Sequence, residues 1–203
     1  PADLPKDFLK NKSLKIGFDP KLFTKKSINI FFGKAGCKYI PINKNLIDKI
    51  WIRKKNEYKN KFYTMPLNSV GESYKLKIKK IVSKLKKSGA DFQFITASEN
   101  NAWLMNIRGN DSRFTPIPHS HLLIDKKKNV KFFCDLKKIS TSFKKKFNKI
   151  EFINIKNIGK ILSKIYKKKI ILDENTCSIH YENIISKNNK IINQQDPIYF
   201  FKA

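Results

Sequence analysis

The chain has 203 residues, 40% of them hydrophobic, which is enough to bury the core of one domain, or of one domain and a smaller piece, without disulfides. No run of about 18 apolar residues occurs, so the sequence predicts no transmembrane helix. The net charge is +28, yet only three of the 44 basic residues are Arg, and the lysines are spread along the whole chain. Because duplex recognition usually relies on Arg, and because A/T-rich codons encode Lys, Asn and Ile, the charge indicates a solvated surface rather than a specific nucleic-acid partner.

Cysteines and the two chain ends suggest the cellular setting. Cys37, Cys134 and Cys177 are odd in number and far apart, which indicates reduced thiols in a cytoplasmic protein and no structural zinc. Residues 1–5 include neither the basic nor the apolar region of a signal peptide. The chain lacks an initiator Met and stops within an apolar run at 199–203, so we expect both ends to be cuts in a longer protein.

Short apolar stretches alternate with amphipathic ones, a pattern that predicts an α/β domain. The elements expected first are a strand at 14–18, a helix at 20–33 opened by Pro20, a strand at 37–40 and a short amphipathic segment at 45–51. Residues 53–70 are polar and irregular. We therefore place a domain boundary in that stretch.

The second part of the chain has clearer periodicity. A helix is predicted at 71–88, with Tyr74, Ile78 and Ile81 on its apolar face, lysines opposite, and Gly89 as the residue that ends it. Ser98 is expected to cap a short helix. The remaining elements are expected as strands at 92–97, 119–125, 130–135, 150–155, 169–173 and 197–202, and as helices at 136–147, 157–167 and 177–187. The strands at 119–125 and 130–135 form a predicted hairpin.

A polar loop follows the short helix and is the main candidate site. It carries Asn106, Arg108, Asp111 and Arg113 directly after Trp103. Two of the three arginines fall here, although nearly all other basic residues are Lys. A requirement for a guanidinium group at these two positions would explain the arginines. The loop is interpreted as facing a substrate or another domain, and the alternative is an internal Arg–Asp pair that pins it.

Other chemistry is weakly indicated. His119 and His121 alternate along a predicted strand, so both rings could face one metal ion, but nothing nearby completes the site. They are weak metal candidates, and a structural role is the alternative. No phosphate-binding glycine loop and no nucleophile elbow occurs in the sequence.

The segment Asn101–Asp111 resembles the "AWL-NLRG-D" signature of the three-domain Xaa-Pro aminopeptidases (aminopeptidase P). Further motifs resemble the same family in the same order, at 17–20 ("GxDP"), 45–51 ("NLVDxIW"), 90–97, 115–116 and 197–203. The resemblance implies an α/β fold of the creatinase/prolidase N-terminal type, with a mixed β-sheet flanked by helices and a ribonuclease H-like motif. It implies that residues 1–61 are the C-terminal half of a first N-terminal domain and residues 62–203 a second such domain. His119 and His121 depart from the family, which usually has apolar or aromatic residues there.

The resemblance also implies a function for the parent protein, a cytoplasmic metallo-exopeptidase that removes the N-terminal residue from peptides with proline second. Its catalytic "pita-bread" domain binds two Mn²⁺ ions and lies beyond this chain, so no metal ligand is assigned here and the chain alone is expected to be inactive. The implied partners are that catalytic domain, which the Arg108 loop is expected to approach, the peptide substrate, and a second copy in a homodimer. The alternatives are a catalytically inactive binding module for nucleic acid or protein and, ranked last, a fragment of a creatinase-type amidinohydrolase.

Overall fold

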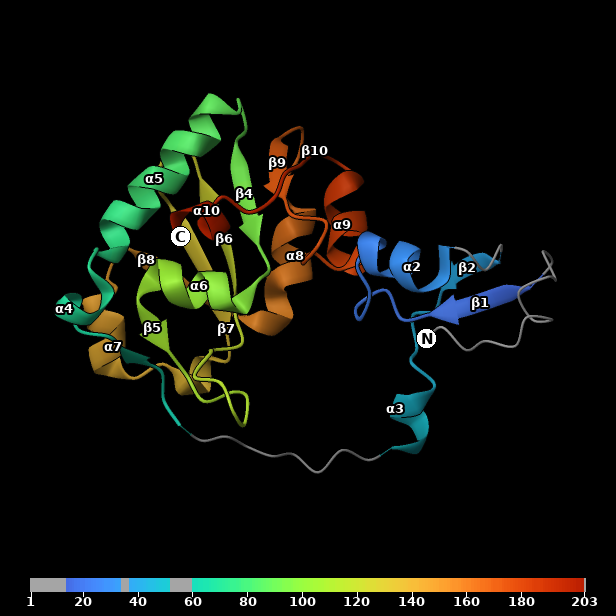
Figure 1. The fold of residues 1–203 in the computed structure, drawn as a ribbon, viewed down its shortest axis with the longest axis horizontal. Coiled ribbons are helices and arrows are strands. Elements are labelled where there is room, and N and C mark those ends of the chain that lie inside the picture. Colours follow the sequence, from blue (N-terminus) through green and yellow to red (C-terminus); the bar gives the residue numbers. More distant parts are fainter. Residues whose placement is uncertain (1–13, 34–36, 52–59, 203) are drawn as a thin grey trace. The chain divides into compact units, whose positions relative to one another are not determined.

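The structure is a computed structural model that describes residues 14–33, 37–51 and 60–202 (Figure 1). Contacts divide the chain into two compact units. The first contains the described residues of Pro1–Asn56 and Glu174–Asn183, and the second those of Glu57–Asp173 and Ile184–Ala203. The domain boundary that the sequence places after residue 61 stays a prediction.

The first unit is built on two parallel strands, β1 (Lys15–Phe18) and β2 (Lys38–Pro41). Helix α2 (Lys25–Phe32) connects them, and the short helix α3 (Ile47–Ile50) follows. The predicted start of the first helix at Pro20 is wrong. A capping box at Thr24 sets the start instead, because the Ser27 N–H donates to Thr24 Oγ1 (3.0 Å) and the Thr24 N–H donates to Ser27 Oγ (2.9 Å).

A later segment of the chain completes this unit. The N–H groups of Ile179 and His180, at the start of α9 (Ile179–Ser186), donate to the carbonyls of Phe23 and Pro20, each over 2.9 Å. The buried carboxylate of Glu182 accepts a 2.6 Å hydrogen bond from Lys25. Large apolar side chains nevertheless stay exposed on this unit, among them Ile30, Leu46, Ile47, Ile50 and Trp51.

The second unit contains a six-stranded sheet in the order β10-β9-β4-β6-β7-β8. Its strands are β4 (Phe92–Ile95), β6 (His121–Asp125), β7 (Val130–Cys134), β8 (Ile150–Asn154), β9 (Lys169–Leu172) and β10 (Lys190–Asn193). Strand β6 is antiparallel to β4 and β7, while the outer pairs run parallel. The predicted α/β class, the mixed sheet and the hairpin are thereby confirmed.

Helices α5 (Tyr74–Lys87), α6 (Ser98–Met105) and α10 (Ile198–Phe201) lie over one face of this sheet (Figure 1). The further helices are α4 (Leu67–Val70), η2 (Leu136–Lys138), α7 (Thr141–Lys146), η3 (Ile155–Asn157) and α8 (Ile158–Ser163). Their apolar side chains form one core with the sheet, exemplified by Ile81, Leu104, Phe132 and Phe147. No helix in the described part of the chain is long and apolar enough to cross a bilayer.

Three predicted elements differ from the structure. The helix expected at 136–147 is two short ones, because Asp135 caps η2 and Ser140 then caps α7 through the Phe143 N–H (3.1 Å). The strand expected at 197–202 is α10, which begins after Pro197, where the Ile198 N–H donates to the Asp196 carboxylate (3.1 Å). The stretch 53–70 was expected to be irregular, but its described part contains β3 (Tyr63–Thr64), which pairs with β5 (Ile107–Arg108).

Candidate functional site

Helix α6 places the predicted loop and ends at a left-handed residue. The predicted cap Ser98 is wrong, because Ala97 holds the cap position and Ser98 Oγ donates instead to the Ser120 carbonyl (3.2 Å). At the other end, Asn106 adopts φ 55°, a conformation that Asn tolerates better than most residues. This turn directs the chain from Trp103 on α6 into β5.

A buried lysine holds that turn. Lys77 on α5 is 2% exposed, and its Nζ donates to Asn106 Oδ1 (2.6 Å) and to the Trp103 carbonyl (2.9 Å). The same ammonium lies 3.9 Å from the centroid of the Trp103 ring, within the range of a cation–π contact. Burial lowers the pKa of Lys77, and Glu72 opposes that shift. The lysines were predicted on the polar face of this helix, and for Lys77 that prediction is wrong.

Both polar atoms of the Asn106 side chain have partners, since Oδ1 accepts from Lys77 and Nδ2 donates to the Glu72 carbonyl (2.8 Å). The backbone carbonyl of Asn106 accepts from the Met65 N–H (3.0 Å). Asn106 therefore joins the residues before α5 to the end of α6. It is a positioning group for the loop, since all of these bonds are internal.

Arg108 on β5 has more donors than the structure uses. Its Nη1 donates to the Ile107 carbonyl (2.9 Å), and the side chain is half-buried. Within residues 14–33, 37–51 and 60–202, no carboxylate lies at ion-pair distance from Arg108. A guanidinium group has five N–H donors, and the described residues supply an acceptor for one of the Arg108 nitrogens, the Ile107 carbonyl.

Asp111 holds the loop in place, and its ionic partner is a lysine rather than an arginine. Its carboxylate accepts from the His119 N–H (2.7 Å) and forms an ion pair with Lys138. Both side chains of the pair are largely buried, 11% exposed for Asp111 and 13% for Lys138. Within the loop, a residue larger than glycine does not fit at position 109, because an added Cβ would lie 2.9 Å from the Phe62 ring. Arg113 is exposed beyond this anchor, 5.6 Å from the ring of Phe114.

The structure therefore divides the five predicted loop residues into two groups. Trp103, Asn106 and Asp111 have internal partners that fix the shape of the loop. Arg108 and Arg113 form no ion pair among the residues that the structure describes, and whether the loop contacts another molecule stays a prediction. The alternative of an internal Arg–Asp pair is not what holds Asp111, whose ionic partner is Lys138.

The two histidines lie next to each other at the start of β6. Their ring centroids are 5.9 Å apart and nearly perpendicular, and His121 also lies 5.9 Å from the ring of Phe94. Burial lowers the pKa of His121 to about 4, with a smaller contribution from His119. No cluster of three or more potential metal-ligating His, Cys, Asp or Glu side chains occurs among the residues that the structure describes. The weak metal candidacy of His119 and His121 stays a prediction.

A buried polar network that the sequence did not reveal lies on the other side of α6. Asp196 is buried and accepts hydrogen bonds from Gln93 Nε2 (3.1 Å) and Asn100 Nδ2 (2.6 Å), while its N–H donates to Asp173 (2.9 Å). Burial raises the pKa of Asp196. Lys202 donates to Asn100 Oδ1 over 2.5 Å, so the segment around α10 is tied to α6.

A family model that matches most of the chain, including the second unit, shows which family the chain belongs to. The model of the creatinase/prolidase N-terminal domain matches residues 53–203. The chain belongs to this family. The predicted resemblance and the fold class of the creatinase/prolidase N-terminal type are thereby confirmed, and the motif around α6 lies inside the matched range.

Individual relatives extend the likeness to nearly the whole chain. Xaa-Pro aminopeptidase ApepP of Drosophila melanogaster is 29% identical over 198 residues, which cover 93% of this chain and 32% of that protein. Xaa-Pro aminopeptidase 1 of Dictyostelium discoideum is 29% identical over 214 residues, covering 95% and 32%. The chain thus spans about a third of the length of these curated relatives, and the matched family is an N-terminal, non-catalytic domain.

A solved structure agrees in fold. X-prolyl aminopeptidase from Caenorhabditis elegans, described as a cytosolic enzyme with a di-nuclear active site, superposes with a TM-score of 0.82 at 20% identity. The superposition covers 100% of this chain and 36% of that one. At this identity the match shows the fold alone.

Proposed function

We propose that this chain is the N-terminal, non-catalytic region of a metal-dependent Xaa-Pro aminopeptidase, which removes the N-terminal residue from peptides with proline second. The observation that carries the proposal is the match of more than nine-tenths of the chain to about a third of two curated Xaa-Pro aminopeptidases. On this proposal the catalysis belongs to a separate domain of the longer protein, and this chain alone is inactive.

The metal ions of the parent enzyme then belong to that catalytic domain. The relative from Caenorhabditis elegans is described with a di-nuclear active site, which supports two metal ions, and we propose Mn²⁺ for both. The described residues of this chain offer no cluster of three ligands. The cytosolic description of the same relative supports a cytoplasmic location.

We further assign the Arg108 loop the role of contacting the catalytic domain or the peptide. The support is the half-buried guanidinium of Arg108 with unused donors, held on a loop that Lys77 and Asp111 keep in one shape. A preorganised donor binds a carbonyl or carboxylate without a large loss of side-chain entropy. The parent is proposed to form a homodimer, and restricting access to the active site is the proposed task of this region.

The proposed division into residues 1–61 and 62–203 has physical support in the first unit. A parallel sheet is normally covered on both faces, but within residues 14–33 and 37–51 the sheet of this unit consists of β1 and β2 alone. Apolar side chains such as Ile50 and Trp51 are 81% and 62% exposed on the same unit. These features are those of part of a domain, as expected if residues 1–61 are the second half of one.

The test is to express this chain alone and as part of the complete gene product, and to assay both with Xaa-Pro peptides and with Xaa-Ala peptides in the presence of Mn²⁺. Hydrolysis of the Xaa-Pro peptides by the complete protein only is the expected result. Turnover by the isolated chain, or a complete protein that cleaves neither peptide, would contradict the proposal.

A further inference from the structure

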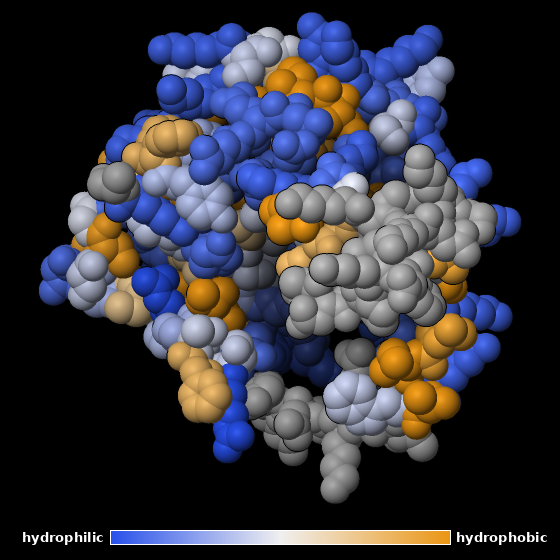
Figure 2. All heavy atoms as spheres, turned by 45° about the vertical axis from the view of Figure 1, so that its right-hand side comes forward, coloured by the Kyte–Doolittle hydropathy of each residue, from blue (hydrophilic) through white to orange (hydrophobic). Residues whose placement is uncertain are grey.

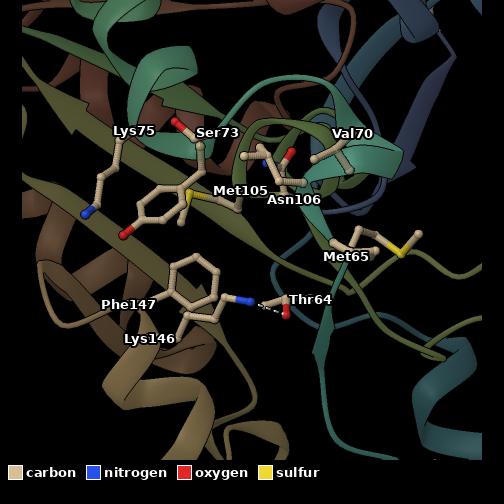
Figure 3. Close-up of a pocket in the computed structure, with 12 residues that line it drawn as sticks. Thr64, Met65, Val70, Ser73, Lys75, Met105, Asn106, Lys146 and Phe147 are labelled. Carbon is tan, nitrogen blue, oxygen red and sulfur yellow. Dashed lines mark hydrogen bonds between the residues drawn. The ribbon is translucent and has the colours of Figure 1, made fainter.

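A pocket of about 360 Å³ opens between α4, the start of α5, the end of α6 and α7 (Figure 3). Its walls are mainly apolar and are made by side chains such as Met65, Leu67, Val70, Met105 and Phe147. Figure 3 shows Met105 above Phe147 near the middle of the view, with Val70 and Met65 on the right. The volume lies at the lower end of the range for small-molecule sites, so an occupant must be small.

The rim of the pocket is positively charged. Lys75 and Lys146 both line it, and none of its lining residues is acidic. Lys146 Nζ donates to Thr64 Oγ1 (2.7 Å), a neutral partner that leaves the ammonium charge uncompensated. An anionic group beside Lys146 Nζ would therefore gain from an uncompensated cation, while an amine would be repelled.

One wall also carries an unsatisfied polar atom. The ring of Tyr74 packs against Phe147, with centroids 4.9 Å apart. The Tyr74 hydroxyl is buried and has no hydrogen-bond partner among the described residues. An unsatisfied buried hydroxyl is unfavourable, and a ligand acceptor that entered beside it would relieve that cost.

From these three features together, we propose that the pocket binds a small ligand with one apolar group and one carboxylate. The apolar group packs against Met105 and Phe147, and the carboxylate lies beside the Lys146 ammonium, next to Thr64. Two sources offer this chemistry, the C-terminal residue of a peptide and a short-chain fatty acid. The site is a property of this chain alone, so it does not depend on the proposed peptidase function.

The pocket also touches the candidate loop. Asn106, which Lys77 fixes at the end of α6, is one of its lining residues. Met65 lies in the same wall and donates its N–H to the Asn106 carbonyl. A bound ligand would therefore be in contact with the residues that precede Arg108.

The direct test is titration of the ¹⁵N-labelled 203-residue chain, followed by amide chemical shifts. The probes are N-acetylphenylalanine and hexanoate, each compared with its uncharged amide at the same ionic strength. We expect saturable shifts around Met65, Val70 and Asn106 with the carboxylates and much weaker binding of the amides. Tighter binding of N-acetylphenylalanine indicates a peptide C-terminus, and tighter binding of hexanoate indicates a fatty acid.

A matched pair of variants separates this pocket from the general positive charge. Lys146→Gln removes a rim cation, and binding of the carboxylates should weaken roughly two- to fivefold. Lys84→Gln removes an exposed lysine from the opposite side of α5, and binding should not change. Equal binding of acid and amide, equal effects of the two variants, or shifts scattered over surface lysines would each overturn the proposal, as would the absence of saturable binding.

Discussion

The ammonium group of Lys77 donates a 2.6 Å hydrogen bond to the side chain of Asn106, the left-handed residue that ends α6. This bond links the middle of one helix to the end of another, 29 residues along the chain. Arg108 follows Asn106 by two residues, so the position of its guanidinium group depends on Lys77, although Lys77 itself is buried.

Replacing this lysine should destabilise the fold. Lys77→Met keeps the length of the side chain but leaves Asn106 Oδ1 without its donor, while the Trp103 carbonyl keeps only the Asn106 N–H (3.3 Å). We expect the free energy of unfolding to fall by about 1–3 kcal/mol, measured by urea denaturation. Lys79→Met, on the exposed side of the same helix, is the control and should change it by less than about 0.5 kcal/mol. Equal stability of the two variants would show that the Lys77 bonds contribute nothing net.

His121 should make the fold sensitive to mild acid. Its pKa is lowered by burial from 6.5 to about 4, so the unfolded chain binds this proton first as the pH falls. Stability from this group is therefore complete above pH 6.5 and is lost progressively between pH 6.5 and about 4. His121→Gln should remove this slope, which amounts to at most about 1.4 kcal/mol per pH unit.

The measurement is the urea midpoint at several pH values across that window. His119→Gln is the matched control, since His119 is exposed, lies two residues away and should leave most of the slope in place. A wild-type slope that persists unchanged in His121→Gln would assign the acid sensitivity to groups other than His121.

How far the sequence predicts this structure depends on the range of the forces involved. Strong periodicity in α5, the apolar strand β4 and the β6–β7 hairpin was sufficient, because a local pattern determines each of them. The errors occurred where one side-chain hydrogen bond at the start of a segment decides whether that segment forms a helix. Asp196 makes a helix of the apolar run 197–202, whose composition alone favours a strand.

The candidate site shows the same limit. The unusual arginines made the loop a candidate, but the alternative of an internal Arg–Asp pair did not foresee that Asp111 pairs with Lys138, and Lys77 was missed. Both partners are distant in sequence, since Lys138 follows Asp111 by 27 residues. For Lys77 a signal existed, because it lies three residues after Tyr74 and four before Ile81, on the apolar face of α5. Because lysines are so frequent in this chain, Lys77 was assigned to the polar face together with the other lysines of the helix.

The buried Asp111–Lys138 pair should matter more than a surface pair of the same kind. Asp111→Ala leaves the Lys138 ammonium and the His119 N–H without an acceptor in a largely buried place. We expect a loss of about 1.5–3 kcal/mol and faster proteolysis within residues 109–119. Glu151→Ala breaks the ion pair with Lys131, in which Glu151 is 58% exposed, and should lower stability by less than about 1 kcal/mol. Equal losses would mean that burial adds nothing to the Asp111 pair.

Arg108→Lys tests whether the loop faces the substrate or the catalytic domain, and it rests on the proposed function. A lysine keeps the charge but loses the planar set of donors, so the fragment should stay folded while the complete enzyme loses roughly tenfold or more in kcat/KM for Xaa-Pro peptides. Arg113→Lys is the control, because that side chain is exposed beyond the Asp111 anchor. A substrate contact would raise KM or lower kcat with the peptide, whereas a domain contact would also lower the melting temperature of the complete protein. Kinetics and melting that are unchanged in Arg108→Lys would leave Arg108 without either role, even if the complete protein is an active aminopeptidase.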